Sequence, residues 1–265
     1  MNFLTLYPKM LLGCAAACVG GMAIILIPSL QSSVWPVSLL IGLIFVLALV
    51  RVFGKWANQR TQALLRMLNA ECRAADFVAE SRKMLPQPGK RGQNYVRLNL
   101  ASGLLNLGQA EQAEEELEKV DLTLYKNRYE DLQYTIMWHY DRVYAALLAG
   151  RAEEAEKRLQ AMRKACADKT LQPLRSGYDV ILKQGETWLK MLRGDYHGAA
   201  KVFEEMFVLN ANSRLNQAGA KYAQGIACLH TGKPEKAREC LQWAAQNGGD
   251  SWYAQKARQA MRENA

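Results

Sequence analysis

A motif of fixed spacing occurs four times along this chain and constrains its fold more than any other feature. Each copy has a glycine, an alanine five positions later and a large apolar residue four positions after that. Glycine permits the backbone of a tight turn, alanine lets two helices approach closely, and the apolar residue continues a buried stripe. The pattern predicts four helical hairpins, with turn and packing positions at Gly108 and Ala113, Gly150 and Ala155, Gly194 and Ala199, and Gly232 and Ala237.

The third and fourth copies resemble the tetratricopeptide repeat, whose second helix typically opens with Gly-Asp-Tyr-x-x-Ala. Residues 194–199 read Gly-Asp-Tyr-His-Gly-Ala, and residues 232–237 match more loosely as Gly-Lys-Pro-Glu-Lys-Ala. The resemblance covers residues 93–246. It implies an all-α fold in which an α-solenoid of about four TPR-like helical hairpins is closed by capping helices.

The copies also depart from that family. Its small residue on the first helix, seven positions before the turn glycine, falls on Ala101 and Gly225, whereas Val143 and Thr187 occupy it in the middle copies. Successive glycines are 42, 44 and 38 residues apart, instead of about 34. We therefore expect additional residues between repeats, around 121–134 and 168–179.

A second feature is an apolar leader without any Asp or Glu in its first 53 residues. Residues 10–27 and 34–53 are each long enough to approach a membrane span, and they predict a two-helix transmembrane hairpin. The cations that follow the second run place both termini and the solenoid in the cytoplasm by the positive-inside rule; they are Arg51, Lys55, Arg60 and Arg66. Tyr7, Trp35 and Trp56 are expected at the membrane interfaces.

Three other readings of the leader are weaker. A cleaved signal followed by a stop-transfer helix lacks a small-residue cleavage site after Ile27. A lipoprotein signal ending at Cys14 has too few apolar residues between Lys9 and that cysteine. A buried hairpin in a soluble protein would be an unusual core. Cys14 and Cys18 lie on one helix face, where packing is favoured over lipid attachment.

These patterns divide the chain into three parts. Residues 1–56 are the predicted membrane anchor and contact the lipid bilayer. Residues 57–92 are a juxtamembrane helical cap or degenerate repeat that ends in a loop at Pro86 to Gly92. Residues 93–265 are the TPR-like solenoid, with a terminal cap helix over 250–264.

The charge and cysteine patterns exclude several function classes. Residues 57–265 contain 31 of the 34 cations and all 25 acids. Because cations alternate with Glu along the helices, nucleic acid is not an expected partner. The six cysteines include no Cys-x-x-Cys pair and fit a reducing compartment. Three single histidines and no catalytic or metal-binding motif predict no enzyme, cofactor or metal.

The repeat register also predicts a groove. In the resembling family, positions 2, 5, 9, 12 and 13 of each first helix line it, and these are mostly aromatic or aliphatic here. They suit an amphipathic helix or apolar segment of a protein partner, although the rings can instead form core between repeats. The main candidates are Tyr95, Leu98, Tyr140, Tyr144, Gln184, Trp188, Tyr222 and His230, and the remaining positions include Leu147, Leu148, Met191, Leu192 and Ile226.

The sequence thus predicts a membrane-anchored scaffold or adaptor that presents a peptide-binding groove. The alternative is a structural accessory subunit of a membrane complex, recognised through its hairpin, whose groove is filled by its own helices. An unrecognised enzyme is third. Partner identity and oligomeric state are not specified by any motif.

Overall fold

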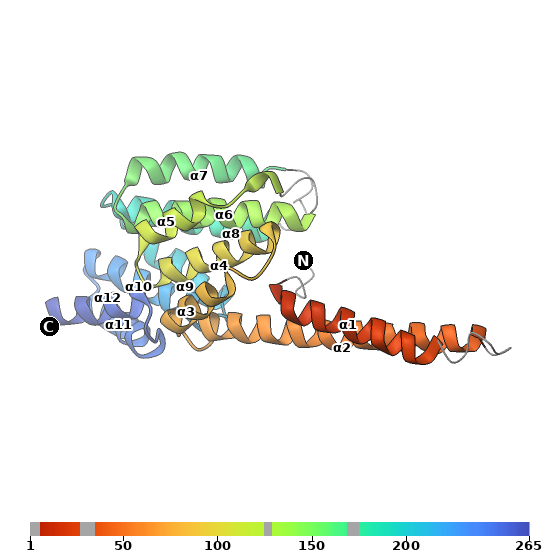
Figure 1. The fold of residues 1–265 in the computed structure, drawn as a ribbon. Helices are drawn as coiled ribbons and strands as arrows, with labels where there is room; N and C mark the ends of the chain where they lie inside the picture. Colours follow the sequence, from red (N-terminus) through yellow and green to blue (C-terminus); the bar gives the residue numbers. More distant parts are fainter. Residues whose placement is uncertain (1–5, 27–34, 125–128, 169–174, 265) are drawn as a thin grey trace. The chain divides into compact units, whose positions relative to one another are not determined.

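The computed structural model describes residues 6–26, 35–124, 129–168 and 175–264 (Figure 1). It confirms the all-helical prediction, because the described residues form α-helices and one short 3-10 turn, with no strand among them. The chain forms two compact units, one comprising residues 1–64 with 84–93 and the other residues 65–83 with 94–265. The helices are α1 (Pro8–Leu26), α2 (Trp35–Asn69), α3 (Ala74–Met84), α4 (Lys90–Asn106), α5 (Ala110–Glu118), α6 (Tyr129–Leu148), α7 (Ala152–Cys166), α8 (Arg175–Leu192), α9 (Ala199–Leu209), α10 (Arg214–His230), α11 (Pro234–Asn247) and α12 (Trp252–Glu263), with a 3-10 turn at Leu122–Leu124.

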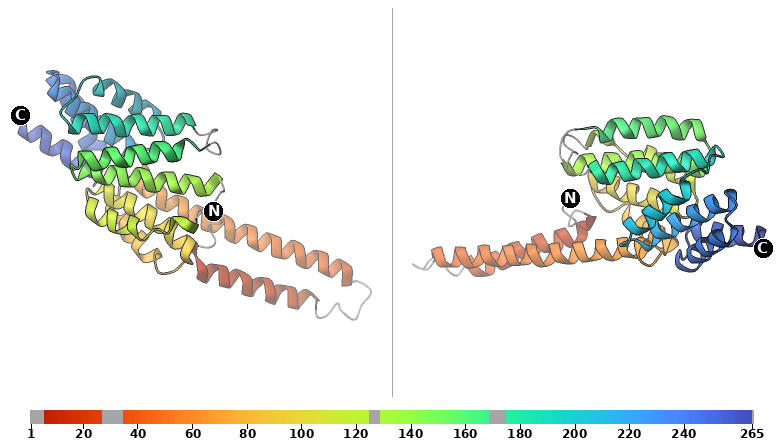
Figure 2. Two further views of the ribbon diagram at one scale, coloured as in Figure 1. Left: turned by 90° about the horizontal axis from the view of Figure 1, so that it is seen from above. Right: turned by 180° about the vertical axis from the view of Figure 1, so that it is seen from behind.

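In the first unit, α1 and the first part of α2 lie side by side (Figures 1 and 2). Glycines permit the contact: a Cβ on Gly21 would lie 2.1 Å from Phe45, and one on Gly42 would lie 2.6 Å from Met22. Small residues that admit a neighbouring helix are typical of helix pairs in membranes.

The prediction of two membrane spans is supported for one helix only. Among the described residues, α2 is the one helix long and apolar enough to cross a membrane, and only 6% of its most apolar window is buried. The apolar part of α1, Pro8–Ile24, is shorter. The predicted external loop and the side chain of Trp35 lie outside what the structure describes.

Two helix ends differ from the predicted boundaries. Helix α2 continues past residue 56 as one helix to Asn69, since the only glycine near that boundary, Gly54, costs a helix only about 1 kcal/mol. Helix α4 already begins at Lys90, inside the predicted loop.

In the second unit, successive hairpins pair α6 with α7, α8 with α9 and α10 with α11, and consecutive helices from α5 onward pack on their neighbours (Figure 2). Helices α4 and α5 are joined by an ion pair between Arg97 and Glu116. The turn glycines all have positive φ: Gly108 at 77°, Gly150 at 72°, Gly194 at 86° and Gly232 at 69°. An L side chain adopts this backbone only with strain. The four packing alanines are buried, at 0% exposure for Ala113, Ala155 and Ala237 and 2% for Ala199.

Helix α3 meets both ends of the solenoid. Phe77 is fully buried and would contact a Cβ placed on Gly103 of α4 at 2.7 Å. At its other side, the Asp250 carboxylate accepts hydrogen bonds from the backbone N–H groups of Ala74 and Ala75 at 2.7 and 2.9 Å. A carboxylate at a helix N-terminus satisfies donors that have no partner within the helix. The turn after α11 therefore caps the first helix of this unit.

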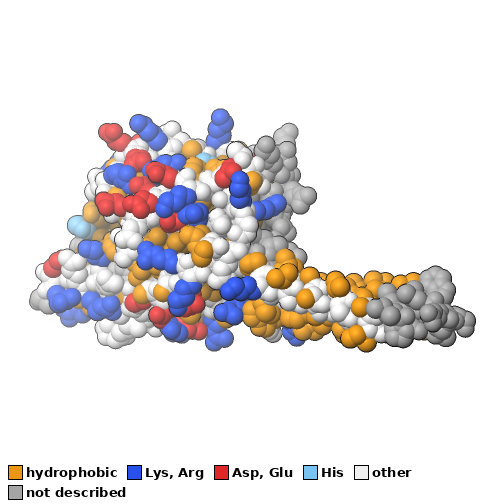
Figure 3. Space-filling view, in the orientation of Figure 1, with side chains coloured by type: hydrophobic (Ala, Val, Ile, Leu, Met, Phe, Trp, Pro, Cys, Tyr) orange, Lys and Arg blue, Asp and Glu red, His pale blue; other side chains and the backbone are white. Residues whose placement is uncertain are grey.

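A cluster of charges joins the first and second hairpins. Glu114 of α5 accepts from Arg151 and from Arg158 of α7, and Arg158 also bonds Glu154. Burial by itself raises the pKa of the Glu114 carboxyl, but hydrogen bonds and charges from the two arginines outweigh it and hold that pKa below its ordinary value. Figure 3 shows acidic and basic side chains intermixed over the visible face of the repeats.

We expect Glu114→Gln to lower stability at pH 7 by about 2 kcal/mol, because it removes charge-assisted hydrogen bonds. A depressed folded-state pKa contributes stability above the unfolded pKa of about 4.3 and loses it as pH falls through the folded value. The difference between wild type and variant should therefore shrink from pH 6 to pH 3 in thermal melts. Glu153→Gln, at an exposed position on α7, is the control and should show little difference at either pH.

Candidate partner-binding pocket

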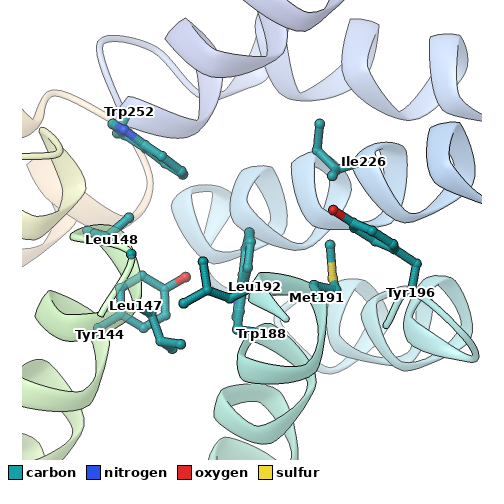
Figure 4. A pocket seen from close by; sticks show the side chains of 10 residues that line it. Tyr144, Leu147, Leu148, Trp188, Met191, Leu192, Tyr196, Ile226 and Trp252 are labelled. Atoms are coloured by element: carbon teal, nitrogen blue, oxygen red, sulfur yellow. The ribbon is translucent and has the colours of Figure 1, made fainter. Parts of the chain in front are cut away.

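The repeats enclose an apolar pocket of about 230 Å³. Figure 4 shows its side chains converging from several helices. No charged side chain lines it; the lining residues are Tyr144, Leu147, Leu148, Gly150, Trp188, Met191, Leu192, Tyr196, Ile226 and Trp252. The arrangement can accept an apolar group, and its lining offers no side chain of opposite charge to pair with an ion.

Most of the lining comes from the inner positions of three successive first helices. Helix α6 supplies Tyr144, Leu147 and Leu148, α8 supplies Trp188, Met191 and Leu192, and α10 supplies Ile226. All seven are positions that the repeat register assigns to the groove. The structure thus brings these predicted residues together.

Two aromatic members of the pocket, Tyr196 and Trp252, are not among the positions that the repeat register predicts. Tyr196 lies in the turn between α8 and α9, and its ring stacks on His230 at 3.9 Å between centroids. Trp252 is the first residue of α12. The Gly-Asp-Tyr motif contained a signal for Tyr196, because it fixes an aromatic residue at the turn, whereas nothing local indicated that Trp252 returns to the groove.

Trp188 is the central aromatic residue of the pocket. Its ring contacts Phe203 at 5.3 Å and stacks near Tyr222 at 6.2 Å. Within the described residues, its buried indole nitrogen makes no hydrogen bond of ordinary geometry. An indole N–H is a donor only, and the hydroxyl of Tyr144 is the acceptor toward which this donor is directed, because burial raises the pKa of Tyr144 and an interaction with Trp188 opposes that larger effect.

Tyr144 forms the buried side of the pocket. It is 7% exposed, and its hydroxyl shares a hydrogen bond of 2.6 Å with the hydroxyl of Tyr253. Burial raises the pKa of Tyr144 and that of Tyr253 well above the ordinary range, and burial raises the pKa of Tyr222 to about 12. These phenols are therefore neutral hydrogen-bonding groups at physiological pH.

The start of α12 fills part of the inner surface of the solenoid. Trp252 contacts Tyr222 with 5.3 Å between ring centroids, and a Cβ on Gly108 would lie 2.2 Å from the Trp252 ring. Tyr253 packs against Gly219 of α10. Helix α12 thus covers part of the groove that the repeat register predicts. The pocket is the part of that groove that α12 leaves uncovered.

The other predicted groove residues lie elsewhere. Leu98 is fully buried and Tyr95 is 9% exposed, with its ring 5.7 Å from that of Tyr134. Tyr140 is partly buried against Tyr144 at 5.5 Å, and Gln184 is half-buried. None of these four lines the pocket, and neither do Tyr222 and His230, which pack behind Trp188 and Tyr196.

One buried acid in α6 has no evident function. Asp141 is 4% exposed, and one of its carboxylate oxygens lacks a hydrogen-bond partner in the part of the chain that the structure describes. Burial raises the pKa of this carboxyl well above its ordinary value. Across the same residues, no three His, Cys, Asp or Glu side chains are grouped so that they could hold a metal ion.

Comparison with known proteins is limited to the repeats. The family model described as tetratricopeptide repeat matches residues 94–119 and 218–243. These segments contain the first and fourth copies of the motif, which are the copies with a small residue, Ala101 or Gly225, seven positions before the turn glycine. No curated protein and no solved structure matches the chain. The two matches support a TPR-like protein built on a helical-repeat array.

Proposed function

We propose that this chain is a membrane-anchored scaffold that binds a protein partner through the apolar pocket of its TPR-like repeats. The observation that carries the proposal is the pocket itself, which is uncharged and lies at inner positions of three successive first helices. TPR-like arrays commonly bind proteins, and aromatic residues in pockets supply much of the affinity at protein interfaces.

The size of the pocket indicates what part of a partner it accepts. An apolar cavity of about 150 Å³ is enough for a benzene molecule, and this pocket is about 230 Å³. It therefore suits one bulky apolar side chain, presented by a helix or an extended segment of the partner. Leu192 is 40% exposed and marks an accessible side of the pocket.

Membrane insertion of α1 and α2 is supported by their surface. Among the side chains that the structure describes, 17 large hydrophobic residues are exposed, and 14 of them belong to these two helices, from Leu11 to Val52. Figure 3 shows hydrophobic side chains over much of the visible surface of this hairpin. Exposed apolar area of this extent costs about 25 cal/mol per Å² in water, whereas a lipid bilayer solvates it. Helix α1 has 19 residues, or roughly 28 Å at 1.5 Å each, close to the hydrocarbon thickness of about 30 Å.

The proposed topology places both termini and the repeats in the cytoplasm. Arg51, Lys55, Arg60 and Arg66 follow the apolar part of α2, and cations near the ends of spans are retained on the cytoplasmic side.

A photo-crosslinking experiment tests the binding role. A photoreactive amino acid at Leu192 in the full chain, expressed in cells, should capture a defined partner. The same label at Val208, which is 69% exposed on α9 and outside the pocket, is the matched control and should not. Adding Leu148→Arg inside the pocket should abolish the Leu192 adduct, while Leu209→Arg on α9 should leave it intact. An adduct insensitive to Leu148→Arg would contradict pocket binding.

The second candidate function, an accessory subunit recognised through its hairpin, is favoured by one observation: Trp252 and Tyr253 already fill part of the inner surface. A photoreactive residue at Leu47, 59% exposed on α2, separates the two functions. Capture of a partner from Leu47 that survives Leu148→Arg, with no capture from Leu192, would support the accessory subunit.

A further inference from the structure

The unit that contains the hairpin carries charges of one sign only. Residues 1–64 and 84–93 include six cations and no Asp or Glu. All six side chains are exposed; they are Lys9, Arg51, Lys55, Arg60, Lys90 and Arg91. We propose that the hairpin base, defined as residues 6–9, 51–61 and 86–92, binds the headgroups of anionic phospholipids. This inference rests on the proposed membrane insertion.

The antiparallel pairing of α1 and α2 gathers the cations at one end of the hairpin. Gly21 packs on Phe45 and Met22 on Gly42, and the Tyr7 hydroxyl lies 3.4 Å from the Thr61 hydroxyl. In these three pairs the residue number on α2 falls as the number on α1 rises, as it does in two antiparallel helices with one constant register. It therefore brings Lys9 to the level of the α2 residues near 56, between Lys55 and Arg60.

Arg60 is held in position by two aromatic rings. Its guanidinium carbon lies 5.7 Å from the centroid of Tyr7 and 5.4 Å from that of Trp56, and the two rings meet edge to face at 5.3 Å. Tyr7 is itself 7% exposed. Tyrosine and tryptophan are enriched at the headgroup level of membranes, and a guanidinium can donate two parallel hydrogen bonds to a phosphate.

The segment 84–93 adds two more cations to the hairpin base. Pro88 is buried, and a Cβ on Gly92 would lie 2.6 Å from Pro88 and 3.5 Å from Leu6. This packing fixes the start of α4 beside the beginning of the chain and so carries Lys90 and Arg91 to the hairpin base. Both side chains are exposed on the first turn of α4.

The position of the cations identifies the partner as a lipid. They flank the exposed apolar surface from Leu11 to Val52, so a ligand must offer negative charge directly beside hydrocarbon. From Arg51 to Arg60, α2 rises about 14 Å, a depth comparable to a headgroup layer with the charged zone next to it. An anionic phospholipid matches this arrangement, because its negatively charged headgroup lies directly beside its acyl chains.

Native mass spectrometry of the full chain tests the proposal. The protein, purified in a zwitterionic detergent, is mixed with equal amounts of phosphatidylglycerol and phosphatidylcholine. We expect adducts of phosphatidylglycerol to dominate by at least about tenfold, since each cation near an anionic surface contributes roughly fivefold. Lys55→Gln with Lys90→Gln should remove most of that preference. Lys157→Gln with Lys190→Gln, two exposed lysines of the repeats, should leave it unchanged.

The inference would be overturned by equal adducts of the two lipids, or by a preference that Lys55→Gln with Lys90→Gln leaves unaffected. Complete competition by millimolar inorganic phosphate would also overturn it, because it would indicate a site for free phosphate. Carbonate extraction of cell membranes keeps the two proposals apart. A chain released by carbonate contradicts the anchor, whereas a chain that resists carbonate but binds both lipids equally contradicts only the headgroup site.

Discussion

Gly108→Ala should destabilise the chain far more than Gly150→Ala, although both glycines are turn residues with nearly the same positive φ, 77° and 72°. An alanine at either position adopts a left-handed backbone at a cost of about 1–2 kcal/mol. At Gly150 the added Cβ meets nothing within 4 Å, whereas at Gly108 it would lie 2.2 Å from the Trp252 ring. Overpacking of this kind adds about 1–3 kcal/mol.

Thermal melts of the two variants measure the difference. For a chain of this size, each kcal/mol corresponds to a shift in Tm of about 2–4 °C, so Gly108→Ala should melt several degrees below Gly150→Ala. Adding Trp252→Ala to both removes the clash, and the two glycine substitutions should then have equal effects. Equal effects in the presence of Trp252 would show that α12 does not close onto the first repeat.

Tyr144→Ala is expected to have the largest effect on stability of any substitution in the pocket. The side chain is 7% exposed, contacts Tyr140 and shares its hydroxyl with Tyr253. Removing a buried aromatic ring costs about 3–5 kcal/mol. Leu192→Ala, at a 40% exposed position of the same pocket, is the control and should cost much less.

The hydroxyl pair can be separated from the ring by a double-mutant cycle in chemical denaturation. Tyr144→Phe leaves the Tyr253 hydroxyl buried without its partner, at a cost of about 1–3 kcal/mol. Tyr144→Phe with Tyr253→Phe removes both hydroxyls and should recover most of that loss. Additive effects of the two substitutions would contradict the contact between α6 and α12. Because Tyr144 supports the fold, partner binding is tested with Leu148 and Leu192 instead.

The parts of this fold that follow from local pattern could be predicted. The glycine-to-alanine spacing indicated the hairpins because a turn needs a left-handed residue, and a close helix pair needs a small one, at fixed positions. The seven inner positions that line the pocket follow from the same register. The continuation of α2 to Asn69 could also have been predicted, since no proline interrupts residues 37–69.

Contacts between distant parts of the chain could not be predicted. Asp250 caps α3 from 176 residues away, and Tyr253 meets Tyr144 from 109 residues away. Neither has a local sequence signal, because an aspartate in a turn and an aromatic pair at a helix start are ordinary in any cap helix. The curvature of the repeats, which brings the two ends together, depends on many small packing angles that a single sequence does not reveal.

We expect α1 and α2 to cross a membrane and to leave the repeats in the cytoplasm, and cysteine labelling tests this topology most directly. Of the six native cysteines, Cys14, Cys72, Cys228 and Cys240 are buried and the other two are half-buried, so the unmodified chain provides the background. In intact cells, an impermeant maleimide should label Ser32→Cys, in the predicted external loop, and should label Gln255→Cys on α12 only after the cells are lysed. Labelling of Gln255→Cys in intact cells, or protection of Ser32→Cys until lysis, would contradict the account.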